Sequence, residues 1–230
     1  MILTGAIANG AAVLTGGLLG LLLRRGMPER INRTVMQGLG LCVLYVGISG
    51  TLEGENVIVV ILSVVLGAVI GSLLDFDARL QALGDFLQAK VARNGQLQGS
   101  SFSAGFVSAT LVICIGAMSI VGSLQSGLSN NHATLLAKSL IDGVFILLMA
   151  STLGAGVCFS AVPVFLYEGA LTLCAGALAP FLTDAVVNEM TCTGSLLIVA
   201  IALNMLKLTD IKVANFLLAP FFPILLCGFF

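Results

Sequence analysis

KSLIDGVFILLMASTLGAGVCFSAVPVFLYE (residues 138–168) holds the charges of this chain that are hardest to place outside a lipid bilayer. Lys138 and Asp142 lie one helical turn apart near the start of one apolar run, and Glu168 lies midway along the next. A charge at the centre of a membrane helix costs about 2.5–3.5 kcal/mol on insertion scales, so such residues usually face a functional interior. We therefore expect a functional site in this stretch.

The composition around this stretch is that of a membrane protein. Of the 230 residues, 58% are hydrophobic and 9% are charged, whereas soluble domains carry about 25% charged residues. The six cysteines form no C-x-x-C pair and have no neighbouring His, so we expect no metal site and no disulfide framework. The sequence also has no phosphate-binding glycine loop, no Walker motif and no H-E-x-x-H. We therefore expect no enzyme activity, no cofactor, no catalytic residue and no nucleic-acid partner.

The apolar runs predict an all-α polytopic membrane protein with about eight transmembrane helices, or seven if the weak turn at 154–156 is not a real break. The expected spans are 2–23, 35–52, 56–74, 103–124, 134–153, 157–182, 192–206 and 213 to the end. Residues 75–95 alternate apolar and charged positions at helical spacing, which predicts an amphipathic helix on the membrane surface. The chain is expected to form a single transmembrane domain, with a first three-helix unit (1–74), a surface helix and linker (75–101), two central helices (102–153) and a second three-helix unit (154–230).

The charges of the loops predict an orientation. With eight spans, nine of the ten basic residues fall on one side. The loops of the other side carry the acidic residues Glu53, Glu55, Asp184 and Glu189. The positive-inside rule then puts the basic loops in the cytoplasm and both termini outside.

A weak internal repeat is consistent with this topology. Residues 36–59 match residues 190–213 at a constant offset of 154 with four identities, and the two segments would run in opposite directions. An inverted repeat of the first three helices against the last three is a known transporter plan, with the substrate site near the midplane. A competing match, of residues 42–52 with residues 114–124, relates two helices that run in the same direction. Four identities in 24 residues are also close to what the shared apolar composition alone would give.

Two readings of the charged residues stay open. Lys138 and Asp142 are spaced to form an ion pair, either a structural pair near the outer interface with Lys138 reaching water, or a gate at the outer mouth. Glu168, bordered by Tyr167, has no cation within four residues, so its partner comes from another helix or from water. It could bind and release protons, or only hydrogen-bond a neighbouring helix.

Three polar residues complete the candidate substrate or ion pathway. Asn9 and Asn204 are expected to form hydrogen bonds between helices. Ser160, followed by Pro163, is expected to open the backbone of its helix, which is tolerated only beside a cavity.

Four segments resemble one family along essentially the whole chain. They are CIGAMSIVGSLQSGL (114–128), LLAKSLIDG (135–143), TLGAGVCFSAVPVFLYEGALTL (152–173) and EMTCTGSLLIVAIALNMLKLTDIKVANFL (189–217). Together with the opening GAIANGAAVLTGGLLG, they resemble the YqgA/YdfK-type bacterial inner-membrane proteins. The resemblance implies a multi-pass inner-membrane protein of unknown function, sometimes labelled a transporter, and it supplies no established site residues.

The leading hypothesis is a small-solute or ion transporter or channel-like permease that is not driven by its own ATP hydrolysis. The alternative is a non-transporting membrane scaffold or sensor, whose basic loop 24–33 and surface helix would hold a cytosolic partner or anionic lipid. Membrane lipids are expected partners, and stripes of small residues predict a homo-oligomer.

Overall fold

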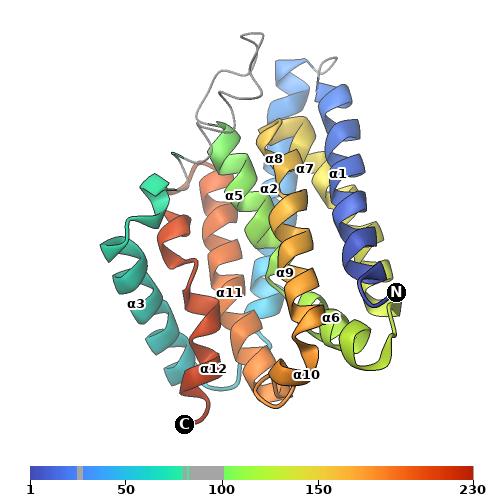
Figure 1. The fold of residues 1–230 in the computed structure, drawn as a ribbon. Coiled ribbons are helices and arrows are strands. Elements are labelled where there is room, and N and C mark those ends of the chain that lie inside the picture. Colours follow the sequence, from blue (N-terminus) through green and yellow to red (C-terminus); the bar gives the residue numbers. More distant parts are fainter. Residues whose placement is uncertain (25–27, 80–81, 83–100, 230) are drawn as a thin grey trace.

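The computed structural model describes residues 1–24, 28–79, 82 and 101–229. These residues form a bundle of helices without a β-strand in the described part, which confirms the all-α prediction (Figure 1). The first helices are α1 (Thr4–Arg24), α2 (Glu29–Thr51), α3 (Val57–Leu73), α5 (Ser101–Cys114), α6 (Ala117–Ser129) and α7 (Ala133–Leu153). They are followed by α8 (Gly156–Phe159), α9 (Ala161–Leu173), α10 (Ala175–Leu178) and α11 (Asp184–Met205). The C-terminal segment consists of two 3-10 helices, η1 (Val213–Phe216) and η2 (Ala219–Phe221), and of α12 (Pro223–Leu226).

Fewer than eight of the described helical segments are long enough to cross a membrane. Among the described residues, five helical segments are long and apolar enough to cross a membrane: α1, α2, α7, the α8–α9 pair and α11. The bent pair α5–α6 makes six if it counts as one span, while α3 and the C-terminal segment are shorter. Every predicted apolar run therefore contains helical structure, but a count of eight full spans is not confirmed. The alternative of merging 134–153 with 157–182 does not hold, because the chain turns at Gly154, where φ is +89°.

The predicted helix 103–124 is not continuous. The axis bends by 59° between α5 and α6, and Gly116 at the break has φ +145°. A side chain disfavours this backbone conformation, so glycine allows the chain to turn there. Another break separates α8 from α9 at Ser160. Pro163 explains it, because its ring lacks a backbone donor and clashes with the carbonyl of the preceding turn.

The close packing of α1 on α7 depends on glycine. A Cβ atom at Gly16 would overlap the carbonyl oxygen of Gly143, and one at Gly20 would overlap that of Leu147. These two residues continue a stripe of small residues at every fourth position of the first helix, which starts with Ala8 and Ala12. Since the backbones touch at these positions, α1 and α7 lie side by side over most of their length (Figure 1).

A second pair of glycines packs in the same way. Gly67 and Gly71 on α3 leave room for the backbone of Ala219 and Asn215 in the C-terminal segment. Both small-residue stripes are thus covered within one chain. They give no support to the homo-oligomer, which stays a prediction.

The helix predicted at 192–206 begins eight residues earlier, at Asp184. Thr183 caps it, because its side-chain oxygen accepts a hydrogen bond from the backbone amide of Val186. Glu189, expected in an outer loop, is therefore inside α11 and only 3% exposed. Its Oε1 accepts hydrogen bonds of 2.7 Å from the backbone amides of Glu55 and Asn56, which ties the α2–α3 connection to α11.

The connections alternate between two ends of the bundle as the sequence predicts. Arg24 lies against Gly154 at one end, and Lys212 Nζ is 3.9 Å from Asp77 Oδ2 there. The loop 52–56, the loop 130–132 and both termini belong to the opposite end (Figure 1). The predicted surface helix 75–95 falls mostly outside the described residues, apart from a helical turn at 76–79.

The helices pack in pairs that the inverted repeat would relate. α1 contacts α9, α2 packs along α11, and α3 packs against η1, η2 and α12. The second unit ends in short helical pieces where the first unit has one helix, so the repeat stays a prediction.

We expect Gly16→Ala to destabilise the protein by about 1–3 kcal/mol, because overpacking forces α1 away from α7. The matched control is Gly38→Ala on α2, where a Cβ atom would meet nothing within 4 Å. Alanine there should be neutral or stabilise the helix by up to about 1 kcal/mol. Thermal unfolding of both variants in detergent measures the difference, and equal midpoints would contradict the close α1–α7 contact.

Glu189→Ala should also lower stability, by about 1–3 kcal/mol, because two backbone amides lose their acceptor. Glu189→Gln keeps an acceptor oxygen and should lose less. Glu53→Ala, an exposed carboxylate in the same connection, serves as the control and should leave the unfolding midpoint unchanged. If Glu189→Ala unfolded at the same temperature as Glu53→Ala, the stabilising role of the hydrogen bonds from Glu55 and Asn56 to Glu189 would be refuted.

Candidate functional site

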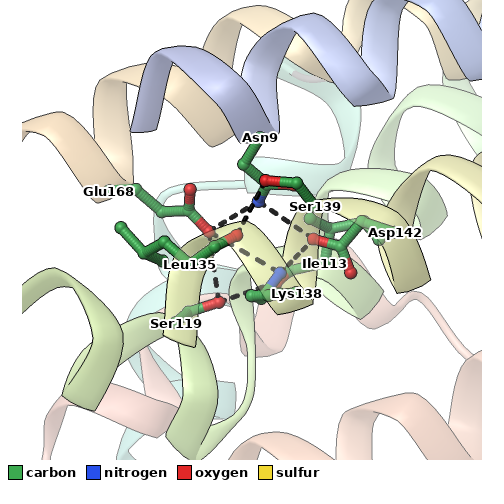
Figure 2. Close-up of polar contacts among 8 residues, drawn as sticks. All are labelled: Asn9, Ile113, Ser119, Leu135, Lys138, Ser139, Asp142 and Glu168. Atoms are coloured by element: carbon green, nitrogen blue, oxygen red, sulfur yellow. Dashed lines mark hydrogen bonds and ion pairs between the residues drawn. The ribbon is translucent and has the colours of Figure 1, made fainter. Parts of the chain in front are cut away.

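Four polar side chains from three helices meet inside the bundle (Figure 2). Asn9 comes from α1, Lys138 and Asp142 from α7, and Glu168 from α9. Asn9 and Glu168 are fully buried, while Lys138 and Asp142 are each 6% exposed. We call these four residues the polar cluster.

Direct hydrogen bonds and ion pairs join the members of the polar cluster. Lys138 Nζ pairs with Asp142 Oδ2 and lies 3.6 Å from Glu168 Oε1. Asn9 Nδ2 donates to Asp142 Oδ2 at 2.9 Å and to Glu168 Oε1 at 2.8 Å. The amide of α1 thus bridges the carboxylates of α7 and α9.

This arrangement differs from the expectation that Lys138 and Asp142 lie near the outer surface, apart from Glu168. The reason is the register of the hairpin formed by α7 and α8–α9. Asp142 stands 12 residues before Gly154 and Glu168 stands 14 residues after it, so the antiparallel helices bring both carboxylates to the same level. The partner of Glu168 was expected from another helix or from water, and the structure shows partners from two other helices, Asn9 of α1 and Lys138 of α7.

The polar cluster also reaches the break between α5 and α6. Ser119, near the start of α6, donates to the backbone carbonyl of Ile113 at 3.0 Å. The same hydroxyl lies 3.5 Å from Glu168 Oε1 (Figure 2). Ser119 is not among the residues predicted from the sequence, although the serines at positions 119, 123 and 126 share one helical face, a spacing visible in the sequence.

Two atoms of the polar cluster have no hydrogen-bond partner. They are Glu168 Oε2 and Asn9 Oδ1, and both are inaccessible to solvent. An unsatisfied buried polar atom costs about 1–3 kcal/mol, and such atoms are positions where buried water binds. The polar cluster also holds two carboxyl groups but one ammonium group, so it carries an excess negative charge when all three are ionised.

A cavity of about 210 Å³ lies beside the polar cluster. Its lining comes from the α5–α6 break, from α9, from α11 and from the C-terminal segment, and includes Thr110, Cys114, Gly116, Tyr167, Pro220 and Phe221. Every lining residue among the described ones is uncharged. Glu168 is not in the lining, but its chain neighbour Tyr167 is.

The remaining predicted site residues lie elsewhere. Ser160 is buried at the α8–α9 break and donates to the carbonyl of Val157 at 2.6 Å. Asn204 forms no bond between helices. Instead it closes the loop after α11 through bonds to Ile211 and Thr209. In the described part of the chain, no group of His, Cys, Asp and Glu side chains could hold a metal ion.

The chain is similar to two bacterial proteins over nearly its whole length. It is 25% identical over 223 residues to the uncharacterized membrane protein YdfK of Bacillus subtilis (strain 168), covering 95% of this chain and 93% of that protein. It is 28% identical over 220 residues to the uncharacterized protein YqgA of Escherichia coli (strain K12), covering 93% and 91%. No solved structure matches the chain.

These similarities confirm the resemblance seen in the sequence. Together with the long apolar helices, they show that the chain is a membrane protein. The sequence profile of one family, described as "Protein of unknown function (DUF554)", matches residues 4–227. The chain therefore belongs to the DUF554 family.

Proposed function

We propose that the chain is a small secondary transporter or permease of the bacterial inner membrane, in which Glu168 binds and releases the coupling proton. The observation that carries this proposal is the buried polar cluster, where two carboxyl groups share one ammonium group. Ionisable groups inside membrane bundles commonly mark ion pathways and proton relays.

The charge balance favours a proton as the transported ion. Burying an uncompensated charge costs several kcal/mol even after relaxation. Lys138 pairs with Asp142 and compensates one carboxylate, so a proton on Glu168 would make the cluster neutral. Glu168 Oε2 has no partner, which leaves it free to carry that proton.

Protonation of Glu168 would also change the hydrogen bonds at the α5–α6 break. An ionised carboxylate only accepts hydrogen bonds, whereas a protonated one also donates. The hydroxyl of Ser119 lies between Glu168 Oε1 and the carbonyl of Ile113. The charge of Glu168 can therefore be transmitted to the start of α6, next to Gly116, where the chain already bends.

The cavity supplies a site for the solute. It lies between two interrupted elements, the α5–α6 pair and the C-terminal segment, and discontinuous helices commonly form the substrate site of secondary transporters. An apolar cavity of about 150 Å³ accommodates benzene, so the 210 Å³ found here fits a small uncharged solute. The hydroxyl groups of Thr110 and Tyr167 can orient it.

A membrane scaffold is the second candidate. It is favoured by the mutual hydrogen bonds of Asn9, Lys138 and Asp142, which also fit a purely structural polar core. A scaffold would hold its cytosolic partner or anionic lipid at the end of the bundle that carries Arg24 and Lys212, which we call the basic end. It would move neither protons nor solute.

Glu168→Gln separates the two candidates. Gln keeps an oxygen that accepts from Asn9 and removes the excess negative charge, so the variant should fold with an unchanged or raised unfolding midpoint. In proteoliposomes containing a pH-sensitive dye, a panel of small uncharged solutes should include one that drives proton movement through the wild-type protein. The variant should reduce that movement at least ten-fold, whereas Glu53→Gln, on an exposed loop, should retain it. Coupled movement that persists in a folded Glu168→Gln would remove Glu168 from the mechanism.

The basic end of the bundle should face the cytoplasm, with both termini outside, because short loops rich in Lys and Arg stay on the cytoplasmic side. Single cysteines at Glu55 and at Lys207, in a background without the native cysteines, test this in intact cells. A membrane-impermeant thiol reagent should label Glu55→Cys and spare Lys207→Cys until the membrane is opened. The reverse pattern would contradict the orientation.

A further inference from the structure

Three serines form a buried row on α6. Ser119, Ser123 and Ser126 are spaced by four and three residues, which puts them on one helical face, and each is fully buried. The row begins at the polar cluster, because Ser119 lies 3.5 Å from Glu168 Oε1.

Thr172 is on α9, the helix that packs against α6. It follows Glu168 by one helical turn and is 1% exposed. The register between α6 and α9 is fixed by Gly127, where a Cβ atom would overlap the carbonyl oxygen of Thr172. Ser123, one turn before Gly127, is therefore level with the turn between Glu168 and Thr172.

The hydroxyl groups of Ser123 and Thr172 have no hydrogen-bond partner. Buried polar groups without a partner are rare in folded proteins. Several other buried hydroxyls of the bundle donate to a carbonyl of the preceding turn of their own helix. These bonds join Ser139 to Leu135, Ser151 to Leu148 and Thr191 to Val187 at 2.7–2.8 Å.

Three other hydroxyls without a partner lie on α3, α5 and α11. The two packed helices α6 and α9, however, carry three such atoms within about two helical turns of one another: Glu168 Oε2 and Thr172 Oγ1 on α9, and Ser123 Oγ on α6. Buried polar groups of this kind are normally satisfied by internal water, so the contact is expected to hold a chain of water molecules.

The row reaches the end of the bundle at His132. Ser126 shares a hydrogen bond with Nδ1 of His132 and lies 3.3 Å from the carbonyl oxygen of Ile2. His132 is partly exposed in the loop between α6 and α7. Imidazole can take up a proton on one ring nitrogen and release one from the other, so this end can exchange protons with water.

Apolar side chains separate the polar cluster from the basic end of the bundle. Val13, Ile146 and Met149 are fully buried on the side of Asp142 that faces the basic end. The backbones of α1 and α7 touch at Gly16 and Gly20, which leaves no space for water between them. Buried hydroxyl groups therefore lie between the polar cluster and the His132 end, whereas apolar side chains and touching backbones lie toward the basic end.

We infer that the α6–α9 contact is a hydrated track of hydroxyl groups, through which protons reach Glu168 from the end of the bundle at His132. The inference rests on the proposed function for the use of the proton, but the water itself is a property of the structure. The track runs from His132 through Ser126, Ser123 and Thr172 to Glu168. By the charge distribution of the loops, its mouth faces the outside of the cell.

A water-resolving crystal or electron-microscopy structure of the full chain tests the track directly. We expect ordered water within hydrogen-bonding distance of Ser123 Oγ, Thr172 Oγ1 and Glu168 Oε2. A contact without water at these three atoms would overturn the inference, whether or not the protein transports anything.

A pair of variants tests the use of the track. Ser123→Val replaces the hydroxyl by apolar volume and should slow solute-driven proton movement in proteoliposomes at least ten-fold. Ser151→Val, at an equally buried serine on α7 whose hydroxyl is already bonded, should leave the rate unchanged. Equal rates in the two folded variants would overturn the proton route. If the wild-type protein moved no protons at all, the proposed function would fail and the water positions alone would decide the inference.

Discussion

The placement of two carboxyl groups and one ammonium group inside an apolar bundle constrains the rest of this structure. Such a group of charges is stable only where its hydrogen bonds are nearly complete and lipid is excluded. The helix α1 meets both requirements. Its glycines Gly16 and Gly20 let it approach α7 until the backbones touch, and that approach brings the amide of Asn9 within 2.9 Å of Asp142 and 2.8 Å of Glu168. The small-residue stripe and the polar cluster are therefore two parts of one arrangement.

Much of the fold could be predicted from the sequence because the membrane simplifies the problem. Apolar runs must be helical, since the bilayer offers no partner for backbone groups, and loop charges alternate between the two ends. The start of α11 was missed because Glu189 resembles a loop residue by charge, although Thr183 followed by Asp184 is a recognisable helix start. Hydropathy does not reveal that a carboxylate can be buried when it accepts bonds from two backbone amides, as Glu189 does.

The candidate site was predictable residue by residue but not as an assembly. Asn9, Lys138, Asp142 and Glu168 were all identified, yet Lys138 and Asp142 were separated from Glu168. Counting outward from Gly154 would have shown that Asp142 and Glu168 face each other, whereas the contribution of α1 needs the tertiary packing. The α5–α6 break could not be predicted from the sequence for a different reason. The chain has 27 glycines, and nothing local to Gly116 distinguishes the one whose φ is +145° from those that pack helices together.

The break at Gly116 divides the surroundings of Glu168 into two parts with different properties. α6, on one side, carries the serine row and connects to the loop at His132. α5, on the other side, adds to the closure of the basic end by α1 and α7, because Gly156 on α8 lies directly against the carbonyl of Phe102. A route along α5 from Glu168 to the basic end would require α5 to separate from α8, while the contact of α6 with α9 could stay intact. Glycine at the break permits a backbone conformation that other residues disfavour, and Ser119 places Glu168 next to that break. Under the proposed function, a change in the charge of Glu168 would therefore act where α5 and α6 join.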